Sequence, residues 1–365
     1  ASRLYHGGSF VVRLQSGVFY EDLITTSSLF DFSFINPNSS ALNDQFSFQF
    51  NGRQTKLGNE ISTAEFHANS CINLFRVAFG TDITRRFWNW KYPKDRKVHS
   101  TVVLKGGNVI AHYGFHDRSA VYNSEPISAS QACDIMVSPE DRGAISNSVF
   151  FELALMAEKP FYAKGASFSF IYGFPHGRHT KLGVRLKLYT PVSPIWALSF
   201  TIPESATEEV QPQSIVSSTL GNASTKAKIH KALKEMNSAE NTLLFKRDFQ
   251  YLLERYVYHP EFQYQIYYYE NSYFILKRSG NRLNLMDYWG ALDCYAQRLA
   301  SFVHYLSPKY PGYKLHLWCL EDILSSFIEP AQVVNTGAYF VYNKYDSELP
   351  DITKWWITMG DTEFL

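Results

Sequence analysis

The strongest constraint on the fold of this chain is a weak internal repeat. An offset of 164 residues places the aromatic segment at 87–92 on the segment at 251–256. The same offset places the apolar pair Val102-Val103 on Ile266-Tyr267, and a turn followed by a second apolar pair comes next in both copies. The order helix, strand, turn, strand therefore recurs, and this recurrence predicts two modules of one architecture.

The hydrophobic pattern after each landmark alternates between the strand and helix periods. In the first copy, a short apolar strand at 133–137 precedes a polar loop, a helical run at 148–158 and a further strand at 166–173. In the second copy the same three elements are expected in the same order, at 285–289, 292–306 and 314–320. A strand–helix–strand unit favours a parallel strand pair, so we predict an α/β fold with mixed sheets and flanking helices.

The chain is too long for one hydrophobic core, because its 365 residues exceed the roughly 250–300 that one core serves. A segment at 201–224 is rich in Ser, Thr, Glu, Gln and Pro, which is typical of a connecting stretch. Helices are expected after it at 226–236 and 245–256. We predict the following organisation: a β-rich N-terminal extension at 1–50, a first module at 51–202, a linker at 203–224 and a second module at 225–365.

The composition excludes several classes of protein. Aromatic residues make up 16% and charged residues 19%, whereas disordered chains are poor in aromatics and rich in charge. The net charge of +1 argues against a strongly basic nucleic-acid binder, and no apolar stretch approaches the roughly 20 residues of a membrane-spanning helix. The N-terminal residues lack a signal-type apolar core, so we expect a cytoplasmic protein.

The four cysteines are far apart in the sequence and form no Cys-x-x-Cys pair. This spacing predicts free thiols in a reducing compartment and gives no sign of structural zinc. The pair His176 and His179 lacks an identifiable third ligand, so we expect no metal.

Several motifs resemble the GNAT (Gcn5-related) N-acetyltransferase superfamily, in particular its tandem-module members. They are Trp88-Asn89-Trp90-Lys91-Tyr92, Asp134-Ile135-Met136-Val137-Ser138-Pro139-Glu140-Asp141-Arg142-Gly143, Tyr172-Gly173-Phe174-Pro175 and Lys181-Leu182-Gly183-Val184. The second half, including the ending Trp355-Trp356-Ile357-Thr358-Met359-Gly360-Asp361-Thr362-Glu363, is similar to the degenerate second module of such proteins. The resemblance covers roughly residues 54–365 and implies two tandem GNAT-like modules.

The resemblance implies a site for acyl-coenzyme A in the first module. In the family, the loop after the fourth strand holds the pyrophosphate through backbone N–H groups at a helix N-terminus. Here the matching positions are Arg142, Gly143, Ala144, Ile145, Ser146 and Asn147. The sequence departs from the family pattern because Ile145 stands where the family has glycine and Asn147 stands at the last small position. A backbone N–H of Met136 or Val137 would polarise the thioester carbonyl.

Three residues are candidates for proton transfer, and Asp361 is a further candidate site residue. Asp134 on the same strand, and His176 and His179 in an expected loop at 174–181, are candidate general bases for an incoming amine. Arg178 and Lys181 in that loop are candidates for binding a phosphate of the cofactor or of the substrate. Asp361 in the C-terminal tail either anchors the tail or contacts substrate. No cofactor site is expected in the second module.

The resemblance implies an N-acyltransferase that moves an acetyl or other acyl group from coenzyme A to an amine of a small molecule. An amino sugar, a nucleotide sugar or an amino-acid-derived metabolite would be the acceptor, attacking the thioester directly in a biosynthetic pathway. Two alternatives stay open: a non-catalytic GNAT-like binding or scaffold protein, and a transferase with another donor such as aminoacyl-tRNA. The net charge gives little support to an RNA partner, and the oligomeric state stays open.

Overall fold

A computed structural model of the chain forms two compact units. Unit 1 comprises 1–116, 132–167 and 178–190, and unit 2 comprises 117–131, 168–177 and 191–365. The structure describes the following residues: 12–14, 18–20, 30–31, 49–50, 53–54, 60–63, 67–93, 99–142, 149–158, 168–204, 212–215, 217–327, 330–346 and 348–362.

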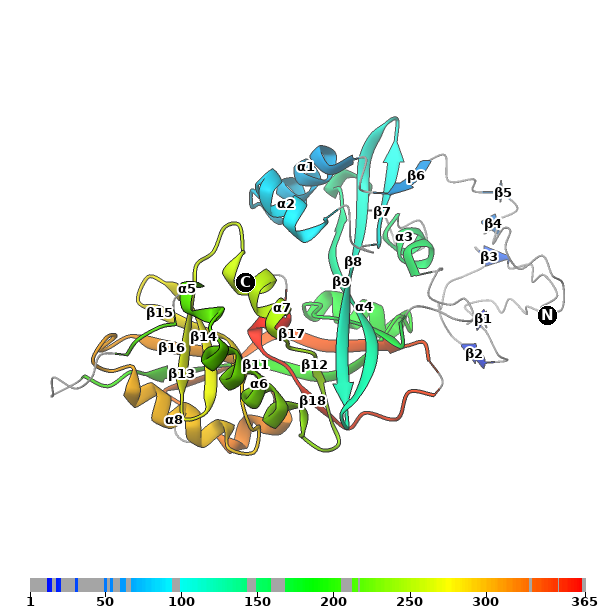
Figure 1. Ribbon diagram of the computed structural model, residues 1–365. Helices are drawn as coiled ribbons and strands as arrows, with labels where there is room; N and C mark the ends of the chain where they lie inside the picture. Colours follow the sequence, from blue (N-terminus) through cyan, green and yellow to red (C-terminus); the bar gives the residue numbers. More distant parts are fainter. Residues whose placement is uncertain are drawn as a thin grey trace. The chain divides into compact units, whose positions relative to one another are not determined.

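The described elements are helices, strands and short turns (Figure 1). The helices are α1 (Ala68–Phe79), α2 (Arg85–Lys91), α3 (Val149–Glu158), α4 (Gly177–Arg185), α5 (Ser217–Leu220), α6 (Ala223–Asn237), α7 (Phe249–Leu252) and α8 (Tyr295–Tyr305). The strands are β1 (Val12–Leu14), β2 (Val18–Tyr20), β3 (Phe30–Asp31), β4 (Gln49–Phe50), β5 (Arg53–Gln54), β6 (Glu60–Thr63), β7 (His99–Lys105), β8 (Asn108–Tyr122), β9 (Glu125–Val137), β10 (Phe170–Gly173), β11 (Thr190–Thr201), β12 (Thr242–Phe245), β13 (Tyr264–Tyr269), β14 (Ser272–Ser279), β15 (Arg282–Trp289), β16 (Lys314–Leu320), β17 (Gln332–Lys344) and β18 (Lys354–Trp356). The turns used below are η2 (Pro139–Asp141), the π-helical turn η5 (Leu253–Val257) and η7 (Met359–Asp361).

Unit 1 is built around the antiparallel hairpin of β7 and β8. Gly106 and Gly107 form its turn with φ of 58° and 79°, a conformation that glycine adopts without a steric penalty. Helix α1 packs on this sheet through Ala68, Cys71 and Leu74, which recur at helical spacing on one face. It ends at Gly80, whose left-handed conformation lets its N–H bond the carbonyl of residue 76.

Unit 2 contains most of a mixed sheet with the strand order β13-β14-β15-β16-β11-β17-β10-β9-β8-β12-β18. In this order, each half of the chain contributes one strand that pairs with a strand of the other half. Strand β11, from the first half, pairs antiparallel with β16, and β17, from the second half, pairs antiparallel with β10. The compact units therefore cut across the modules at 51–202 and 225–365, whose bounds stay a prediction.

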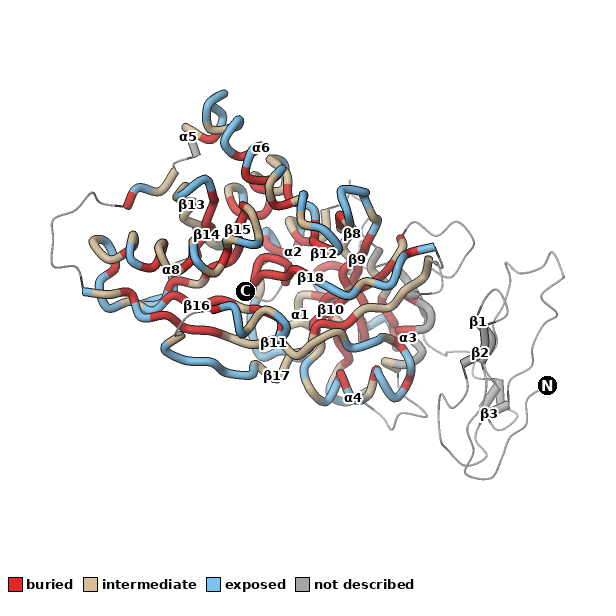
Figure 2. The backbone as a smooth tube through the Cα atoms, turned by 90° about the horizontal axis from the view of Figure 1, so that it is seen from below, coloured by how far each residue is buried: buried red, intermediate tan, exposed pale blue. Residues whose placement is uncertain are grey.

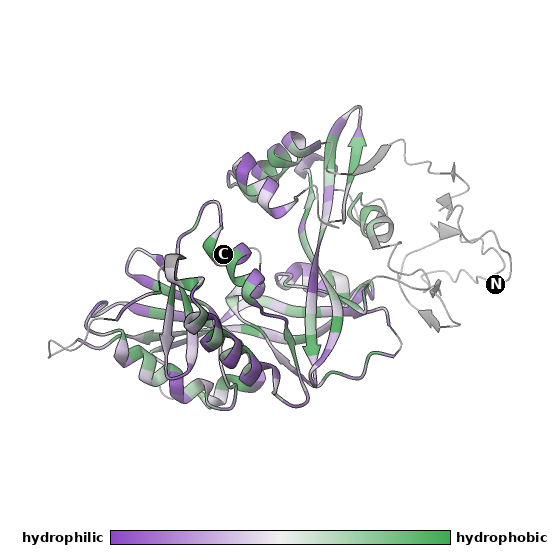
Figure 3. Cartoon of the chain, in the orientation of Figure 1, coloured by the Kyte–Doolittle hydropathy of each residue, from purple (hydrophilic) through white to green (hydrophobic). Residues whose placement is uncertain are grey.

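Helices α6 and α8 supply apolar side chains to the larger core of unit 2, which also includes buried residues of β13, β14, β15 and β16. Figure 2 shows β14 and β15 as largely buried, and both strands carry runs of five buried residues. Figure 3 shows hydrophilic residues along α6, whose lysines stand at the surface. Within the described part of the chain, no helix is both long and apolar enough to cross a membrane.

Several predicted elements are confirmed. Strands β9 and β10 form the predicted parallel pair, and β16 covers the predicted range at 314–320. The helix predicted at 245–256 begins only at Phe249, because Phe245 is the last residue of β12 and pairs with Ala120. Helix α6, predicted at 226–236, begins at Ala223, inside the segment at 203–224 that was predicted to be a linker.

The predicted loop at 174–181 is wrong in its second half, because α4 begins at Gly177. Thr180 and Gly183 are buried on one face of this helix, and the ring of Tyr189 lies against Gly183. Packing of this face, rather than intrinsic propensity, therefore accounts for the helix. The predicted extension at 1–50 contains the described strands β1, β2, β3 and β4, and its other residues lie outside the described residues.

Candidate active site

The end of strand β9 has an open edge. Strands β9 and β10 pair in parallel from Ala129 opposite Phe170 to Gln131 opposite Tyr172. Strand β9 then continues into unit 1 as far as Val137. Among the described residues, β8 is the only strand paired with this continuation. The opposite edge at 132–137 therefore has backbone groups directed away from the sheet.

The direction of the backbone N–H groups distinguishes Met136 from Val137, the two donors predicted from the sequence. The N–H of Ser138 donates to the carbonyl of Ile110 in β8 over 2.7 Å. Since successive N–H groups of an extended strand point to opposite edges, the N–H of Val137 points to the open edge. The N–H of Met136 points back toward β8, and the Met136 side chain is buried in the core of unit 1. The geometry therefore favours Val137 over Met136 as a donor to a ligand.

Arg142 lies at the same edge. Its Nε donates to the carbonyl oxygen of Val137 over 3.1 Å, which holds the guanidinium beside the end of β9. The turn η2 between these two residues is held by an ion pair of 2.8 Å from Lys105 to Asp141. The remaining positions predicted to bind the pyrophosphate, Gly143, Ala144, Ile145, Ser146 and Asn147, lie outside the described residues.

Asp134 lies in the middle of β9 with a φ of 46°, a strained value for a residue other than glycine. Three side chains hold it there. Lys91 Nζ and Tyr92 Oη donate to its carboxylate over 2.8 Å and 2.7 Å, and His112 Nδ1 donates to its carbonyl oxygen over 2.7 Å. The other ring nitrogen of His112 lies 2.5 Å from the hydroxyl of Ser100. These contacts fix α2 to β9 and β8.

Burial and neighbouring charges together determine the charges in this network. Burial by itself would raise the pKa of Asp134, but the Lys91 charge and the hydrogen bonds from Lys91 and Tyr92 outweigh it, so the pKa is lowered. Burial lowers the pKa of His112 despite its bond to the Asp134 carbonyl, which keeps the imidazole neutral near pH 7. Asp134 is only 4% exposed and is paired with a lysine. This arrangement suits a residue that positions β9 rather than one that takes a proton from a substrate.

The four basic site residues predicted in the segment at 174–181 are all exposed. Arg178, His179 and Lys181 stand on α4 in unit 1, and the carbonyl of His179 accepts a hydrogen bond of 2.5 Å from Tyr189. His176 belongs to unit 2, where it bridges Ala338 beside Gly337. Gly337 has a φ of 78°, and a Cβ there would approach His176 Nε2 to 2.7 Å. The catalytic roles of His176 and His179 stay predictions.

Asp361 anchors the C-terminal tail inside unit 2. Its carboxylate is fully buried and accepts hydrogen bonds from Arg247 Nη2 over 2.7 Å and from the backbone N–H of Thr358 over 2.8 Å. Arg247 also pairs with Asp287 of β15 at 3.3 Å, and Tyr256 donates to Asp287 over 2.9 Å. The turn η7 therefore lies against β15, and no described atom of Asp361 is exposed to a substrate.

Sequence reasoning missed the partners in both buried networks. The missed residues are Lys91, Tyr92 and His112 in unit 1, and Arg247, Tyr256, Asp287 and Thr358 in unit 2. A signal was present, because Lys91 and Asp287 each interrupt a run of apolar residues. A charge in such a run is buried only with a partner, although the sequence does not say which one. Among the described residues, no group of three His, Cys, Asp or Glu side chains could hold a metal ion.

The fold has clear counterparts among solved structures. A GCN5-related N-acetyltransferase from Kribbella flavida matches with a TM-score of 0.56 and 13% identity, over 80% of this chain and 72% of that one. A conserved protein of unknown function from Enterococcus faecalis V583 matches with a TM-score of 0.55 and 12% identity, over 79% and 72%. A GCN5-related N-acetyltransferase from Anabaena variabilis matches with a TM-score of 0.52 and 12% identity, over 79% and 73%. No family model and no curated protein matches the sequence. At these identities the likeness establishes the fold.

Proposed function

We propose that this chain, which has the fold of the GCN5-related N-acetyltransferases, transfers an acyl group from coenzyme A to an amine of a small molecule. The acceptor would be an amino sugar, a nucleotide sugar or an amino-acid-derived metabolite. The observation that supports this function best is the open edge of β9, where Val137 directs its N–H outward and Arg142 lies beside it. A strand edge that ends next to a cation offers both a donor and a positive charge to one ligand.

The described residues fit an acyl-coenzyme A donor. Bound in this place, the donor supplies an activated acyl thioester. The N–H of Val137 would donate to the oxygen on which negative charge develops, and it needs no rearrangement because the strand already holds it. Arg142 would contribute positive charge for a phosphate, and its bond to Val137 keeps the two groups together. The buried Lys91–Asp134 pair would hold β9 in position during the reaction.

The amine acceptor must lose a proton as the new bond forms. Asp134 is buried and paired, whereas His176 and His179 are exposed. We therefore retain these two histidines, and not Asp134, as candidates for accepting that proton. Arg178 and Lys181 remain candidates for a phosphate of the donor or of the acceptor.

The first test is calorimetric titration with acetyl-coenzyme A and with coenzyme A. We expect micromolar binding that weakens about tenfold or more in Arg142→Ala, because one charge-assisted contact contributes about 1.5–3 kcal/mol. Arg86→Ala is the matched control, since Arg86 is an exposed arginine of α2 in the same unit. An unchanged thermal midpoint in both variants would show that neither substitution disturbs folding.

The outcome also separates the alternatives. Binding that depends on Arg142 would justify screening amines for release of free coenzyme A. Absence of binding at millimolar concentration would contradict the acyl-coenzyme A function. Aminoacyl-tRNA would then be the next donor to test, and a protein that binds neither donor would have to be treated as a binding or scaffold protein.

A further inference from the structure

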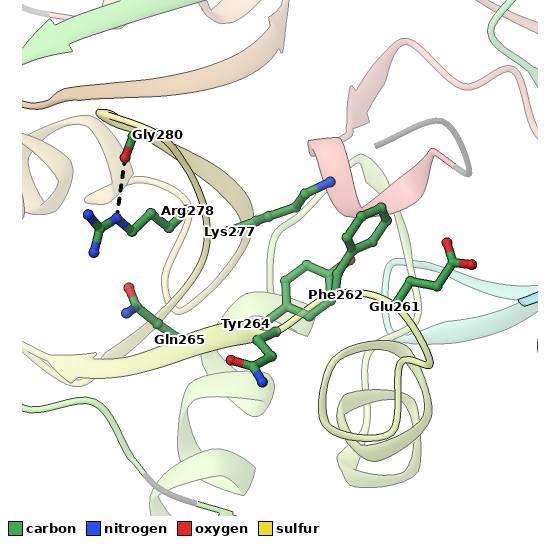
Figure 4. A pocket seen from close by; sticks show the side chains of 8 residues that line it. Glu261, Phe262, Tyr264, Gln265, Lys277, Arg278 and Gly280 are labelled. Atoms are coloured by element: carbon green, nitrogen blue, oxygen red, sulfur yellow. Dashed lines mark hydrogen bonds between the residues drawn. The ribbon is translucent and has the colours of Figure 1, made fainter. Parts of the chain in front are cut away.

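A second candidate site lies in unit 2, in a pocket of about 660 Å³ where β13 begins and β14 ends (Figure 4). Its lining residues are Glu261, Phe262, Gln263, Tyr264, Gln265, Lys277, Arg278 and Gly280. Pockets that bind small molecules commonly enclose about 300–1,000 Å³ and combine aromatic walls with a few polar groups. This pocket has two aromatic rings, two amides, two cations and one carboxylate.

Lys277 is the cation that points into the pocket. Its Nζ lies 3.5 Å from the centroid of the Phe262 ring, and Figure 4 shows the amine directed toward that ring. Burial lowers the pKa of Lys277, and the nearby guanidinium of Arg255 lowers it further. Among the described residues, no carboxylate contributes to this shift. The amine of Lys277 thus lies against an aromatic face, which attracts a cation.

The sheet face that carries Lys277 also carries other polar side chains. Strand register places Lys277 beside Asn284, Asn284 beside His316 and His316 beside Ser199, across four neighbouring strands. Ser199 is only 3% exposed, and neither its Oγ nor His316 Nε2 has a hydrogen-bond partner within the described part of the chain.

Two more cations lie on this face, two residues before Asn284 and His316 along their strands. Arg282 and Lys314 stand opposite each other at the start of β15 and β16. Burial lowers the pKa of His316, and the charges of Arg282 and Lys314 lower it further. Three cations and two polar atoms without a partner among the described residues, His316 Nε2 and Ser199 Oγ, thus share one face of the sheet. Such a face attracts an anion.

We propose that this pocket binds an organic anion that carries a planar ring, with its anionic group at Lys277 and its ring against Tyr264. A lysine recognises a phosphate or carboxylate as a point charge, and an aromatic side chain contributes stacking to a planar ring.

This site is separate from the edge of β9, because all of its residues belong to unit 2. It does not rest on acyl transfer. Substitution of Lys277 should leave the binding of acetyl-coenzyme A unchanged, and substitution of Arg142 should leave this pocket unchanged. A failure of one proposal can therefore be told apart from a failure of the other.

The probe for the test is uridine 5′-monophosphate, with uridine and inorganic phosphate as its two halves. We expect calorimetry to show that the monophosphate binds at least tenfold more tightly than either half. Lys277→Met, which keeps a side chain over Phe262, should weaken binding about tenfold, and Lys277→Arg should retain most of it. Lys228→Met is the matched control, because Lys228 lies over the Tyr268 ring at 4.7 Å outside the pocket.

Two results would overturn the proposal. Equal affinity of the wild type and Lys277→Met would exclude Lys277 as the anion site, provided that both proteins unfold at the same temperature. Phosphate that binds as tightly as uridine 5′-monophosphate would exclude the aromatic wall from recognition. Tighter binding of the monophosphate that is lost in Lys277→Met and unchanged in Lys228→Met would support it.

Discussion

The two segments that the offset of 164 residues aligns, called copies below, share a tyrosine–aspartate contact but use it differently. Tyr92 donates to Asp134 of β9 over 2.7 Å, and Tyr256, at the repeat offset of 164 residues, donates to Asp287 of β15 over 2.9 Å. The helices before them begin alike. Thr84 accepts a hydrogen bond from the N–H of Phe87, and its counterpart Asp248 accepts one from the N–H of residue 251.

The cations differ between the copies. In the first copy Lys91, next to Tyr92, pairs directly with the aspartate. In the second copy the aligned Arg255 donates instead to the carbonyls of Gly360 and Thr362, and Arg247 replaces it at Asp287. The C-terminal tail therefore holds the aligned cation and lies against β15, whereas no described strand other than β8 pairs with β9 at 132–137.

The largest expected effect is that of Arg247→Met. It leaves the buried carboxylates of Asp287 and Asp361 without their shared cation, and breaking a buried pair in this way costs about 3–5 kcal/mol. We expect a value near the upper end, measured as the free energy of unfolding in urea. Lys246→Met is the control, because Lys246 forms a half-exposed ion pair with Asp248 that should contribute at most about 1 kcal/mol. Similar losses in the two variants would show that the tail is not held by this cluster.

Lys91→Met tests the simpler network of the first copy. It leaves one buried carboxylate rather than two, so we expect a loss of about 3 kcal/mol in the free energy of unfolding. The double variant Lys91→Met/Asp134→Asn removes the orphaned charge and should recover part of that loss. A double variant that is no more stable than Lys91→Met would argue that the charge of Asp134 is not what the lysine compensates.

As the pH falls, Asp134 and Asp287 should change the stability of the folded state in opposite directions. The pKa of Asp134 is lowered on folding, so its contribution to stability is present above its unfolded pKa near 4 and is lost as the pH falls through the lower folded value. The pKa of Asp287 is raised by burial and by Asp361 despite Arg247, so its protonation favours the folded state as the pH falls. We expect Asp134→Asn to flatten the acid limb of a stability–pH curve and Asp287→Asn to steepen it. Equal slopes would contradict the comparison.

Gly360→Ala tests the contact of the tail with β15. A Cβ at this position would collide with Tyr256 Oη and approach the carbonyl oxygen of Met286 to 2.8 Å. Overpacking of this kind costs about 1–3 kcal/mol, so a loss of about 2 kcal/mol is expected in urea unfolding. Gly221→Ala is the control, because no atom lies within 4 Å of its added Cβ. A neutral Gly360→Ala would mean that the tail moves away from β15 at little cost.

The smallest effect is expected for the helix caps, where the two copies should agree. Thr84→Ala and Asp248→Ala each remove one side-chain acceptor from a helix N-terminus, which costs about 1 kcal/mol. Thermal unfolding should show similar shifts for the two variants. A much larger shift for one of them would show that the copies have diverged at the cap as well as at the cation.

Local features of the fold could be predicted from the sequence, but long-range pairings could not. The offset of 164 residues aligned the helix, the first turn and the hairpin strands of both copies, because it rests on short-range periodicity. Helix α4 was missed because its signal is tertiary: Gly183 packs against Tyr189, and no helix start is evident in its sequence. The exchange of β11 and β17 was also missed, since hydrophobic alternation identifies a strand without identifying its neighbour.

The candidate site was predicted in part for the same reason. The strand end at Val137 and the cation Arg142 follow from a motif that is continuous in sequence. The role of Asp134 depends on Lys91, which lies 43 residues away, so its burial could not be inferred from the motif alone. Lys277 gave no sequence signal, because its pocket is formed by a hairpin whose aromatic residues resemble any half-buried strand.

The exchanged strands also affect the order in which the protein can be made. Strand β10, at 170–173, borders β17 at 341–344, which a ribosome synthesises about 170 residues later. The sheet therefore cannot close while its first half is being translated, and the apolar side chains of β10 must wait for the last part of the chain. Folding during synthesis is expected to stop at a partial intermediate, in which this gap in the sheet is a place where a chaperone could bind.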